Sequence, residues 1–463
     1  MPDTTPPLWT AKDIATATGG KIEGGDFTAS GLTYNSREIA PGELFLALKG
    51  ARDGHEFADS AFAAGATGAL VEHAVGGPCV VVPDTLHGLE AMGAFARDRT
   101  LAKRGAVTGS VGKTSVTQAI KAGLDLAGPA HASIKSYNNH IGVPLTLARM
   151  PQATERAVFE IGMNAPGEIA PLSKQVRPHA ACVTTVGPVH IEAFVDGEAG
   201  VAREKASIFE GLAPGGLAVI NGDIRWVDTL KSAALAVDAD IAVFGSAAGH
   251  DARLIDFAPF EGGARVKAEL RGRALDFTLK QSGFHWGLNS LAVLLMLEAL
   301  DVSTDTALQA LGQFQPLKGR GETHTVAIPG GAFTLIDESY NANPLSMTAG
   351  FRSLGAKPIQ PGGRRVVVLS DMLELGDQSA AMHAGLAEPI AEAGLDIVHA
   401  AGPEMRHLYD ALPPARRGVW AATAAELAAQ VADLVGVNDI VMVKGSNGSK
   451  ASLVAAALAA LQR

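Results

Sequence analysis

The sequence predicts an α/β protein of three domains, and three observations support this. Its 463 residues are enough for roughly three domains of ordinary size. Strand-like and helix-like segments alternate along most of the chain, which is typical of parallel sheets covered by helices. A glycine-rich turn joins a strand to a helix near residue 110. We therefore expect a small N-terminal α/β module (1–103), a central P-loop parallel-sheet domain (104–322) and a C-terminal doubly wound α/β domain (323–463).

Composition excludes several classes of protein. Hydrophobic residues make up 47% and charged residues 19%, which allows a large core and excludes global disorder. The formal charge of −10 argues against a nucleic-acid-binding surface. No uninterrupted apolar run reaches about 18 residues, so no membrane span is expected. The first residues, Met1 to Pro7, lack the basic and apolar regions of a signal peptide, and Cys79 and Cys182 lie in apolar runs. We expect buried thiols and a cytoplasmic location.

The N-terminal module contains a strand candidate at 44–48, a helix at about 58–64 and two short apolar runs, 69–71 and 79–82. Arg37 and Lys49 lie near turns, where a pair of cations is able to bind a diphosphate. On the residues alone, two solvated surface cations are the better interpretation.

The stretch from Ala106 to Ser115 predicts a phosphate loop. A short β-branched run leads into Gly109 and Gly112, which let successive backbone N–H groups turn towards an anion. Lys113 then reaches the β- and γ-phosphates, and the Thr114 hydroxyl is suited to Mg²⁺. Val107 stands where the common pattern has a glycine. The alternative is a tight strand–helix turn with a solvated lysine.

Other polar residues follow further strand candidates of the central domain, at 157–161, 181–186, 217–221 and 241–244. Ligands of parallel sheets bind beyond the carboxyl ends of the strands, so Glu160 is placed to face the loop and bind Mg²⁺. His190 follows the next strand, although a capping role fits it equally well. Lys205 lies on a mixed helix and, from the residues alone, is expected to be solvated. The segment from 249 to 280 predicts an antiparallel insertion.

Two polar loops follow buried strands of the C-terminal domain, whose strand candidates are 334–337, 365–369, 397–399 and 440–443. The first loop, 337–344, is either a ligand site or an Asx-rich turn before a helix starting near Pro344. The second, 443–449, carries Lys444 and small polar residues suited to a carboxylate. Between the two domains, glycines flank a basic pair at 316–321, which predicts a hinge.

Taken together, these stretches resemble the Mur ligase family over nearly the whole chain. The resemblance rests on Asn35–Arg37 with Pro41–Phe45, Thr108–Thr114, Asn138–Leu145, Glu160–Asn164, His190, Lys205–Phe209, Asp337–Pro344, Met372–Gly376 and Lys444–Ser446. It implies an ATP-dependent peptide ligase that joins D-alanyl-D-alanine to UDP-N-acetylmuramoyl-tripeptide through an acyl phosphate, in peptidoglycan precursor synthesis. Ser339–Pro344 and Asn138–Pro144 indicate this dipeptide-adding type.

The resemblance also implies residue roles. ATP would be bound by Thr108, Gly109, Ser110, Val111, Gly112, Lys113, Thr114 and Ser115, with Asn289 at the adenine and Arg320 and Asp337 at the phosphates and ribose. Thr114 and Glu160 would bind one Mg²⁺ and His190 a second, with a carbamylated Lys205 suited to bridging Mg²⁺. The catalytic residues would be Lys113, Glu160, His190 and Lys205. The substrates would contact Ser36, Arg37 and Lys49 (uridine diphosphate), Asn139 and Asn164 (muramoyl-peptide), and Tyr340, Asn343, Lys444 and Ser446, of which Lys444 and Ser446 lie near the incoming dipeptide.

Three positions depart from the family pattern. Trp286 replaces an asparagine, so adenine would be held partly by stacking. Asn35 stands where aspartate is usual, and His140 where an acidic residue is common. The alternatives are a sister ligase for another amino acid, including a folylpolyglutamate synthetase, or a nucleotide-gated binding protein that hydrolyses ATP without ligation. A monomer without nucleic-acid partners is expected.

Overall fold

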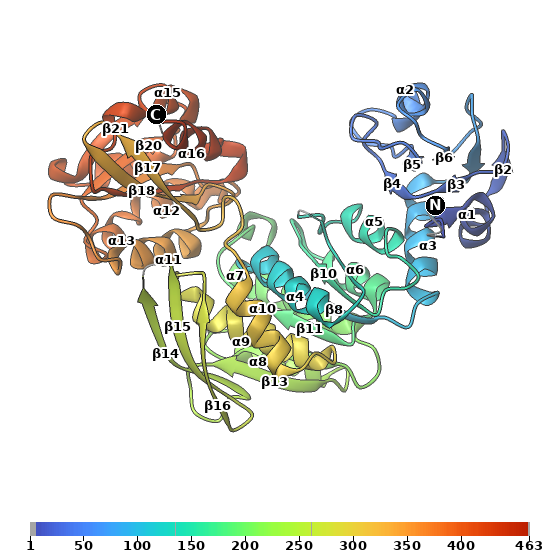
Figure 1. Ribbon diagram of the computed structural model, residues 1–463, viewed down its shortest axis with the longest axis horizontal. Helices are drawn as coiled ribbons and strands as arrows, with labels where there is room; N and C mark the ends of the chain where they lie inside the picture. Colours follow the sequence, from blue (N-terminus) through green and yellow to red (C-terminus); the bar gives the residue numbers. More distant parts are fainter. Residues whose placement is uncertain (1–5, 135, 261, 462–463) are drawn as a thin grey trace.

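The computed structural model describes residues 6–134, 136–260 and 262–461, which form three sheet-containing modules (Figure 1). The N-terminal and C-terminal modules lie above opposite ends of the central one. Residues 1–5, which belong to the stretch expected to lack a signal peptide, lie outside the described residues. No helix in the described part of the chain combines the length and apolarity that a membrane crossing requires.

The N-terminal module has a five-stranded sheet in the order β2-β7-β6-β5-β4, with β2 antiparallel and the others parallel. A separate antiparallel pair joins β1 and β3. The strands are β1 (Trp9–Thr10), β2 (Lys21–Glu23), β3 (Thr28–Ala29), β4 (Gly31–Thr33), β5 (Glu43–Leu46), β6 (Gly68–Val71) and β7 (Cys79–Val81). The helices are α1 (Ala11–Thr18), α2 (Ala58–Ala63) and α3 (Thr85–Asp98).

The central module has a nine-stranded sheet in the order β16-β15-β14-β13-β12-β11-β8-β10-β9. Its strands are β8 (Lys103–Thr108), β9 (Ala130–Ala132), β10 (Arg156–Glu160), β11 (Ala180–Val183), β12 (Leu217–Asn221), β13 (Asp240–Gly245), β14 (Ala252–Phe260), β15 (Gly263–Leu270) and β16 (Arg273–Leu279). The helices are α4 (Lys113–Ala127), α5 (Gly142–Ala148), α6 (Ile169–Val176), α7 (Glu198–Ala206), α8 (Val227–Leu235), α9 (His285–Ala299) and α10 (Thr304–Gln313).

The C-terminal module has a six-stranded sheet in the order β17-β18-β22-β19-β20-β21, parallel except for β17. Its strands are β17 (Glu322–Ile328), β18 (Gly331–Glu338), β19 (Arg365–Ser370), β20 (Ile397–Ala401), β21 (Arg417–Ala421) and β22 (Ile440–Lys444). The helices are α11 (Pro344–Gly355), α12 (Ser379–Ala384), α13 (Ala387–Glu392), α14 (Met405–Ala411), α15 (Ala424–Ala428) and α16 (Ala451–Ala459).

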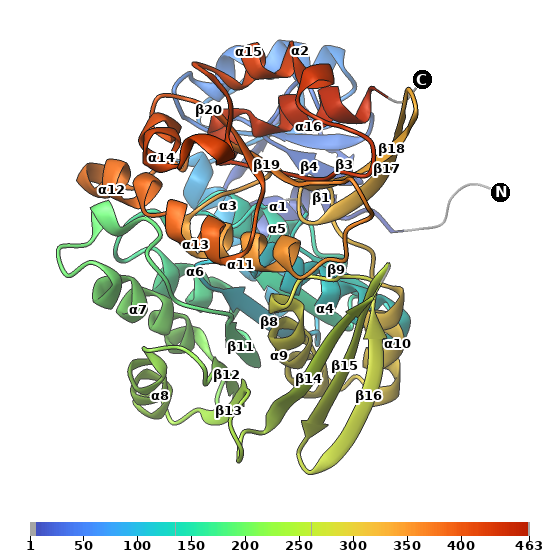
Figure 2. The same cartoon turned by 90° about the vertical axis from the view of Figure 1, so that its left-hand side faces the viewer.

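The predicted α/β alternation is confirmed, with two refinements. The antiparallel insertion is the three strands β14, β15 and β16, which extend the parallel sheet because β14 pairs with β13 (Figure 2). Strand β11 ends at Val183, earlier than expected, so the chain to His190 is a loop. The exact limits of the domains at 103/104 and 322/323 stay a prediction. Cys79 and Cys182 are free and buried, as expected.

Helix α9 is the centre of the main core. Most of it is buried, and from Ser290 to Leu297 every residue is, because α4, α10 and the sheet surround it. This explains why its sequence from Leu291 to Leu297 is uniformly apolar rather than amphipathic. The opposite face of the sheet is covered by a second core to which α5, α6, α7 and α8 contribute. Burial on both faces fixes the strands and therefore the loops at their carboxyl ends.

The N-terminal module shares a core with the central one. Trp9 is fully buried and packs in a cluster that includes Leu145 and Ala148 of α5. Its indole Nε1–H donates a hydrogen bond to the carbonyl of Ala148 at 2.8 Å. Helices α3 and α5 also pack against each other. An apolar interface of this kind holds the two modules in a fixed orientation.

We predict that Trp9→Phe destabilises this interface by about 1–3 kcal/mol, because the Ala148 carbonyl loses its buried donor. The change is measured as a fall in the midpoint of urea unfolding followed by circular dichroism. Trp226→Phe is the control, since Trp226 donates to the half-exposed carboxylate of Glu198, which water solvates after the substitution. Equal effects of both substitutions would contradict the prediction.

Candidate functional site

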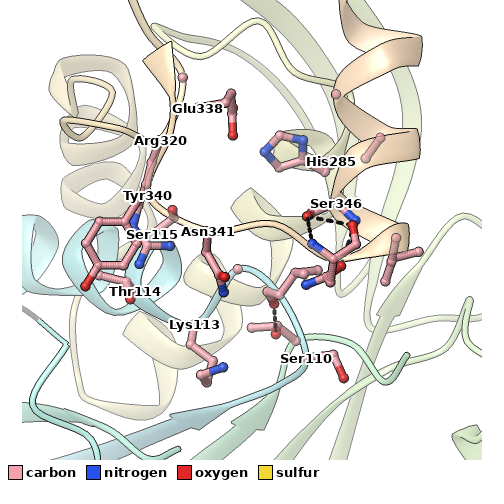
Figure 3. Close-up of a pocket in the computed structure, with 18 of the residues that line it drawn as sticks. Ser110, Lys113, Thr114, Ser115, His285, Arg320, Glu338, Tyr340, Asn341 and Ser346 are labelled. Carbon is pink, nitrogen blue, oxygen red and sulfur yellow. Dashed lines mark hydrogen bonds between the residues drawn. The ribbon is translucent and has the colours of Figure 1, made fainter. Parts of the chain in front are cut away.

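A cavity of about 540 Å³ lies between the central and C-terminal modules. It opens at the carboxyl ends of β8 and β10 and of β18 and β22, as expected for ligand sites of parallel sheets. Residues from both modules face one another across it (Figure 3). The predicted residues that line it are Ser110, Val111, Gly112, Lys113, Thr114, Ser115, Asn139, Glu160, Asn164, His190, Asn289, Arg320, Tyr340, Asn343 and Lys444.

The phosphate loop has the backbone that the sequence predicted. Gly109 and Gly112 have φ angles of 149° and 86°, which favour glycine. A Cβ on Gly109 would lie 1.9 Å from Oγ1 of Thr184, and that hydroxyl donates to the Val111 carbonyl at 2.6 Å. Helix α4 follows with no side-chain cap, so the N–H groups of its first turn are available to an anion.

Lys113 is held at the loop. Its Nζ donates to the Gly109 carbonyl at 2.8 Å. Burial lowers the pKa of Lys113, while the nearby Glu160 carboxylate acts in the opposite direction. The interpretation of Lys113 as a merely solvated lysine is therefore wrong.

Glu160 presents a buried carboxylate oxygen without a partner. The side chain is 1% exposed, and Oε1 accepts from Nδ2 of Asn138 at 2.7 Å. Oε2 has no hydrogen-bond partner among the described residues. Gly162 permits this contact, because a Cβ there would lie 2.7 Å from Cγ of Asn138. A buried carboxylate oxygen without a donor is suited to a cation.

These features fit a magnesium ion. Mg²⁺ typically uses one or two carboxylates and takes its other ligands from phosphates and water. The Thr114 hydroxyl and the Glu160 carboxylate line the same cavity. Within the described residues, no group of three His, Cys, Asp or Glu side chains forms a metal site by itself.

His190 and Lys205 have strongly shifted pKa values. Burial, helped by Lys113 and Lys205, lowers the pKa of His190 to about 4. Burial also lowers the pKa of Lys205 well below its usual value, and Lys113 adds to this. Lys205 is 2% exposed on α7, so the expectation of a solvated lysine is wrong. The helix faces the core, which the sequence pattern around Lys205 did not reveal.

Side chains of the C-terminal module form the opposite wall. Lys444 is 3% exposed and donates to Oε2 of Glu338 at 3.2 Å and to the Asn341 carbonyl at 3.1 Å. Tyr340 donates to Oγ of Ser136 at 2.9 Å, and Ser136 is 3.3 Å from Oγ1 of Thr114. This chain of hydroxyls connects the C-terminal module directly to the phosphate loop.

Arg320 and Asn289 bring the hinge and α9 to the same site. The guanidinium of Arg320 lies over the Tyr340 ring, 4.1 Å from its centroid, a cation–π contact. A Cβ on Gly112 would lie 3.5 Å from the Asn289 amide, so Asn289 is adjacent to the loop. Trp286 lines the cavity but is only 4% exposed and packs near Phe314. Its stacking on adenine stays a prediction.

Two predicted asparagines also accept backbone N–H groups where helices begin, and Asn343 is the N-cap of its helix. Asn343 Oδ1 accepts the Ser346 N–H at 2.9 Å at the start of α11. Asn139 Oδ1 accepts the Gly142 N–H at 2.9 Å at the start of α5. The 337–344 loop is therefore an Asx-rich turn before a helix and at the same time part of the cavity wall, so the two interpretations of its sequence are compatible.

Several predicted residues do not line the cavity. Thr108 is buried at the end of β8 and Gly109 begins the loop. Asp337 accepts the Ser339 N–H at 3.0 Å, and Ser446 Oγ donates to the Ala342 carbonyl at 3.2 Å. Ser36, Arg37 and Lys49 belong to the N-terminal module.

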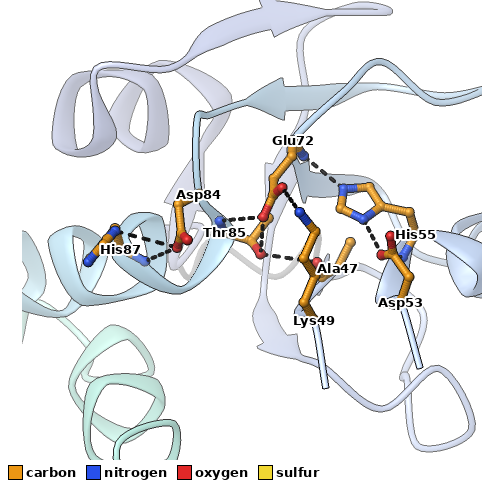
Figure 4. Close-up of polar contacts among 8 residues, drawn as sticks. All are labelled: Ala47, Lys49, Asp53, His55, Glu72, Asp84, Thr85 and His87. Atoms are coloured by element: carbon orange, nitrogen blue, oxygen red, sulfur yellow. Dashed lines mark hydrogen bonds and ion pairs between the residues drawn. The ribbon is translucent and has the colours of Figure 1, made fainter. Parts of the chain in front are cut away.

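Lys49 is part of a polar network in that module (Figure 4). Its ammonium forms an ion pair with Glu72, whose Oε1 also accepts from the Thr85 N–H at 3.3 Å. The Glu72 N–H in turn donates to Nε2 of His55 at 2.8 Å. Lys49 is therefore paired rather than simply solvated, and an anionic ligand there would compete with Glu72.

Sequence reasoning missed several residues of the site. Asn138, Glu338 and Glu374 lie inside stretches that carried the family resemblance. Their position in those stretches was the one sign in the sequence that they belong to the site. Ser136 and Lys357 had no such signal, because their roles depend on how the modules meet. Lys357 on the C-terminal side donates to Oγ of Ser282 of the central module at 2.8 Å.

Comparisons with known proteins identify the family of this chain. Three family models match in order: "Mur ligase family, catalytic domain" at residues 28–85, "Mur ligase middle domain" at 107–297 and "Mur ligase, glutamate ligase domain" at 319–447. A UDP-N-acetylmuramoyl-tripeptide–D-alanyl-D-alanine ligase of Escherichia coli (strain K12) is 34% identical, covering 85% of this chain and 86% of the relative. The chain belongs to the Mur ligase family.

Two other members of the family match almost end to end. The ligase of the same name from Rickettsia prowazekii (strain Madrid E) is 29% identical, covering 96% of this chain and 98% of its own. The crystal structure of MurF from Acinetobacter baumannii aligns with a TM-score of 0.86 at 28% identity, covering 98% and 99% of the two chains. The three-module α/β architecture is therefore shared with Mur ligases.

We predict that Gly109→Ala prevents ADP binding, because the new methyl group collides with Thr184 and distorts the loop. Isothermal titration calorimetry with ADP measures the loss. Gly312→Ala on α10 is the control, since its Cβ would meet only the Thr278 carbonyl at 3.6 Å, an ordinary contact. Wild-type ADP affinity in Gly109→Ala would show that the nucleotide binds elsewhere.

Proposed function

We propose that this chain is an ATP-dependent ligase that joins D-alanyl-D-alanine to UDP-N-acetylmuramoyl-tripeptide in peptidoglycan precursor synthesis. The decisive observation is the arrangement of one cavity, in which a phosphate loop and the unpartnered oxygen of Glu160 face Lys444 of the C-terminal module. Phosphoryl chemistry on one wall and a buried cation on the other suit the activation of one substrate and the binding of a second. The names of the relatives supply the identity of these substrates.

The reaction has two steps. The terminal carboxylate of the tripeptide takes the γ-phosphoryl group of ATP, which gives an acyl phosphate and ADP. The amine of D-alanyl-D-alanine then attacks the acyl carbon, the amide bond forms, and phosphate leaves with the bonding electrons. The amine loses its proton during this step. A carboxylate is a poor electrophile, so phosphorylation supplies the leaving group and no side-chain nucleophile is needed.

The central module would stabilise the charge that develops in the first step. The loop N–H groups and Lys113 would bind the phosphates, while Thr114 and Glu160 would hold one Mg²⁺ and His190 a second. When bound, Mg²⁺ neutralises charge as two anions approach each other. Lys205 would contribute as a carbamate, because burial lowers the pKa of its amine and so favours the neutral form that adds CO₂.

The remaining assignments distribute the substrates over the three proposed domains, 1–103, 104–322 and 323–463. ATP would extend from the loop to Asn289, with Arg320 and Asp337 at its phosphates and ribose. Ser36, Arg37 and Lys49 would bind the uridine diphosphate, and Asn139 and Asn164 the muramoyl-peptide. The dipeptide would lie near Lys444 and Ser446, beside Tyr340 and Asn343. A monomeric, cytoplasmic enzyme without nucleic-acid partners is part of the proposal.

We predict that purified protein converts UDP-N-acetylmuramoyl-tripeptide, ATP and D-alanyl-D-alanine into the pentapeptide, detected by mass spectrometry. Tripeptides with meso-diaminopimelate and with lysine are compared, which identifies the accepted third residue. Release of phosphate must depend on the dipeptide. Dipeptide-independent release without a peptide product would instead support a nucleotide-gated binding protein.

We predict that Lys113→Ala reduces turnover by about 100-fold or more, because the transferred phosphoryl group loses its nearest cation. The rate is followed as ADP release under saturating substrates. Lys121→Ala is the matched control, since Lys121 lies on the same helix but pairs with Asp125 outside the cavity. A wild-type rate in Lys113→Ala would remove the loop from the mechanism.

A further inference from the structure

A close polar contact connects the C-terminal module to His190. Oε2 of Glu374 lies 2.7 Å from Nδ1 of His190, and both side chains line the cavity. Glu374 follows β19 in the C-terminal module, whereas His190 follows β11 in the central one. The contact is therefore formed only when the two modules are docked as they are here.

Buried side chains of the C-terminal module hold the backbone of the loop that carries Glu374. The Met372 N–H donates to Nε2 of His383 at 3.0 Å, and the Leu373 N–H donates to Oγ of Ser446 at 3.0 Å. His383 is fully buried and Ser446 is 5% exposed. Nδ1 of His383 contacts the Ser379 carbonyl at 2.8 Å, so this ring donates there and accepts from Met372. The two residues that precede Glu374 are therefore held in place by hydrogen bonds to buried side chains.

Both ends of the contact have an unusual backbone. His190 and Glu374 have φ angles of 58° and 64°, in the left-handed region that non-glycine residues rarely adopt. The neighbouring Gly376 lies against the central module, since a Cβ there would be 3.0 Å from Cβ of Glu192. Such backbone conformations persist where the surroundings impose them, and they are concentrated at functional sites.

The chemistry of imidazole gives this contact a consequence. A carboxylate at Nδ1 keeps the proton on that nitrogen, which leaves the lone pair on Nε2 free to bind a metal. Partners of this kind orient metal-binding histidines, and their loss typically weakens metal affinity 10- to 100-fold. Because the Glu374 side chain is 56% exposed, its removal leaves no buried charge and the fold should tolerate it.

We propose that Glu374 is a positioning residue that fixes the tautomer and orientation of His190 for Mg²⁺, so that docking of the C-terminal module completes the metal site. The inference rests on the proposed function, in which His190 holds Mg²⁺. It assigns a role to a residue outside the ligand set and makes metal affinity dependent on the position of a whole module.

The test measures Mn²⁺ binding by electron paramagnetic resonance in the presence of a non-hydrolysable ATP analogue, so that turnover is not the readout. Glu374→Ala should raise the Kd of the His190-dependent Mn²⁺ about 10-fold or more. Glu374→Gln, which keeps an acceptor for Nδ1–H, should restore much of the affinity. Asp377→Asn removes an equal charge from an exposed position of the same loop and should leave the Kd unchanged.

A double-mutant cycle shows whether Glu374 acts through His190. In a His190→Ala background, Glu374→Ala should have no further effect on Mn²⁺ affinity. Histidine-selective ¹⁵N spectra, with His190 assigned by its substitution, should show the Nδ1–H tautomer in wild type and its loss in Glu374→Ala. A general structural defect would not change one ring selectively.

The outcomes separate this inference from the proposed function. If wild type forms the pentapeptide but Glu374→Ala binds Mn²⁺ as wild type does, the positioning role is wrong and the ligase assignment stands. An additive effect of the two substitutions would likewise overturn it. If wild type forms no pentapeptide, the proposed function itself fails, whatever the Mn²⁺ titrations show.

Discussion

The site depends on one close contact, between the backbone of Gly109 and the hydroxyl of Thr184. The Thr184 hydroxyl donates to the Val111 carbonyl, and its Oγ1 is 3.2 Å from the carbonyl of Thr108, so it joins both sides of the turn. The Ser110 N–H donates to the Thr185 carbonyl at 2.8 Å. These bonds connect the loop to the end of β11. Only glycine leaves enough space for this approach, which fixes the turn that leads into α4.

The same contact sets the positions of the charged groups around the loop. Strands β8, β10 and β11 are adjacent in the sheet, so their carboxyl ends bring the loop, Glu160 and the segment leading to His190 together. Lys113 and Glu160 then influence one another, as the opposing effect of Glu160 on the pKa of Lys113 indicates. Burial of these groups makes their interactions stronger than they would be in water.

Local sequence predicted the parts of the site that are local in the chain. The loop at 109–112 and the helix after it form one contiguous pattern, and Glu160 was found because it ends a strand. Lys205 was wrongly expected to be solvated, because its burial depends on how α7 packs and its neighbours in sequence are mixed. The bond between Tyr340 and Ser136 spans 204 residues, and no local pattern specifies which surfaces of two modules meet.

The central module contacts the N-terminal module through an apolar core and the C-terminal module through polar side chains. Trp9 and Leu145 belong to one apolar core, so the N-terminal module is docked by burial. The cores of the C-terminal module, in the described part of the chain, consist of residues from Val326 onward and do not merge with those of the central module.

Instead, polar contacts hold the C-terminal module, and those of Tyr340, Lys357 and Glu374 all end at the cavity. Hydrogen bonds of this kind contribute only about 0.5–1.5 kcal/mol each. A ligand that contacts both walls would therefore add to the docking of this module through bonds of its own. The N-terminal module is held by an apolar core, whereas polar contacts around the cavity hold the C-terminal module.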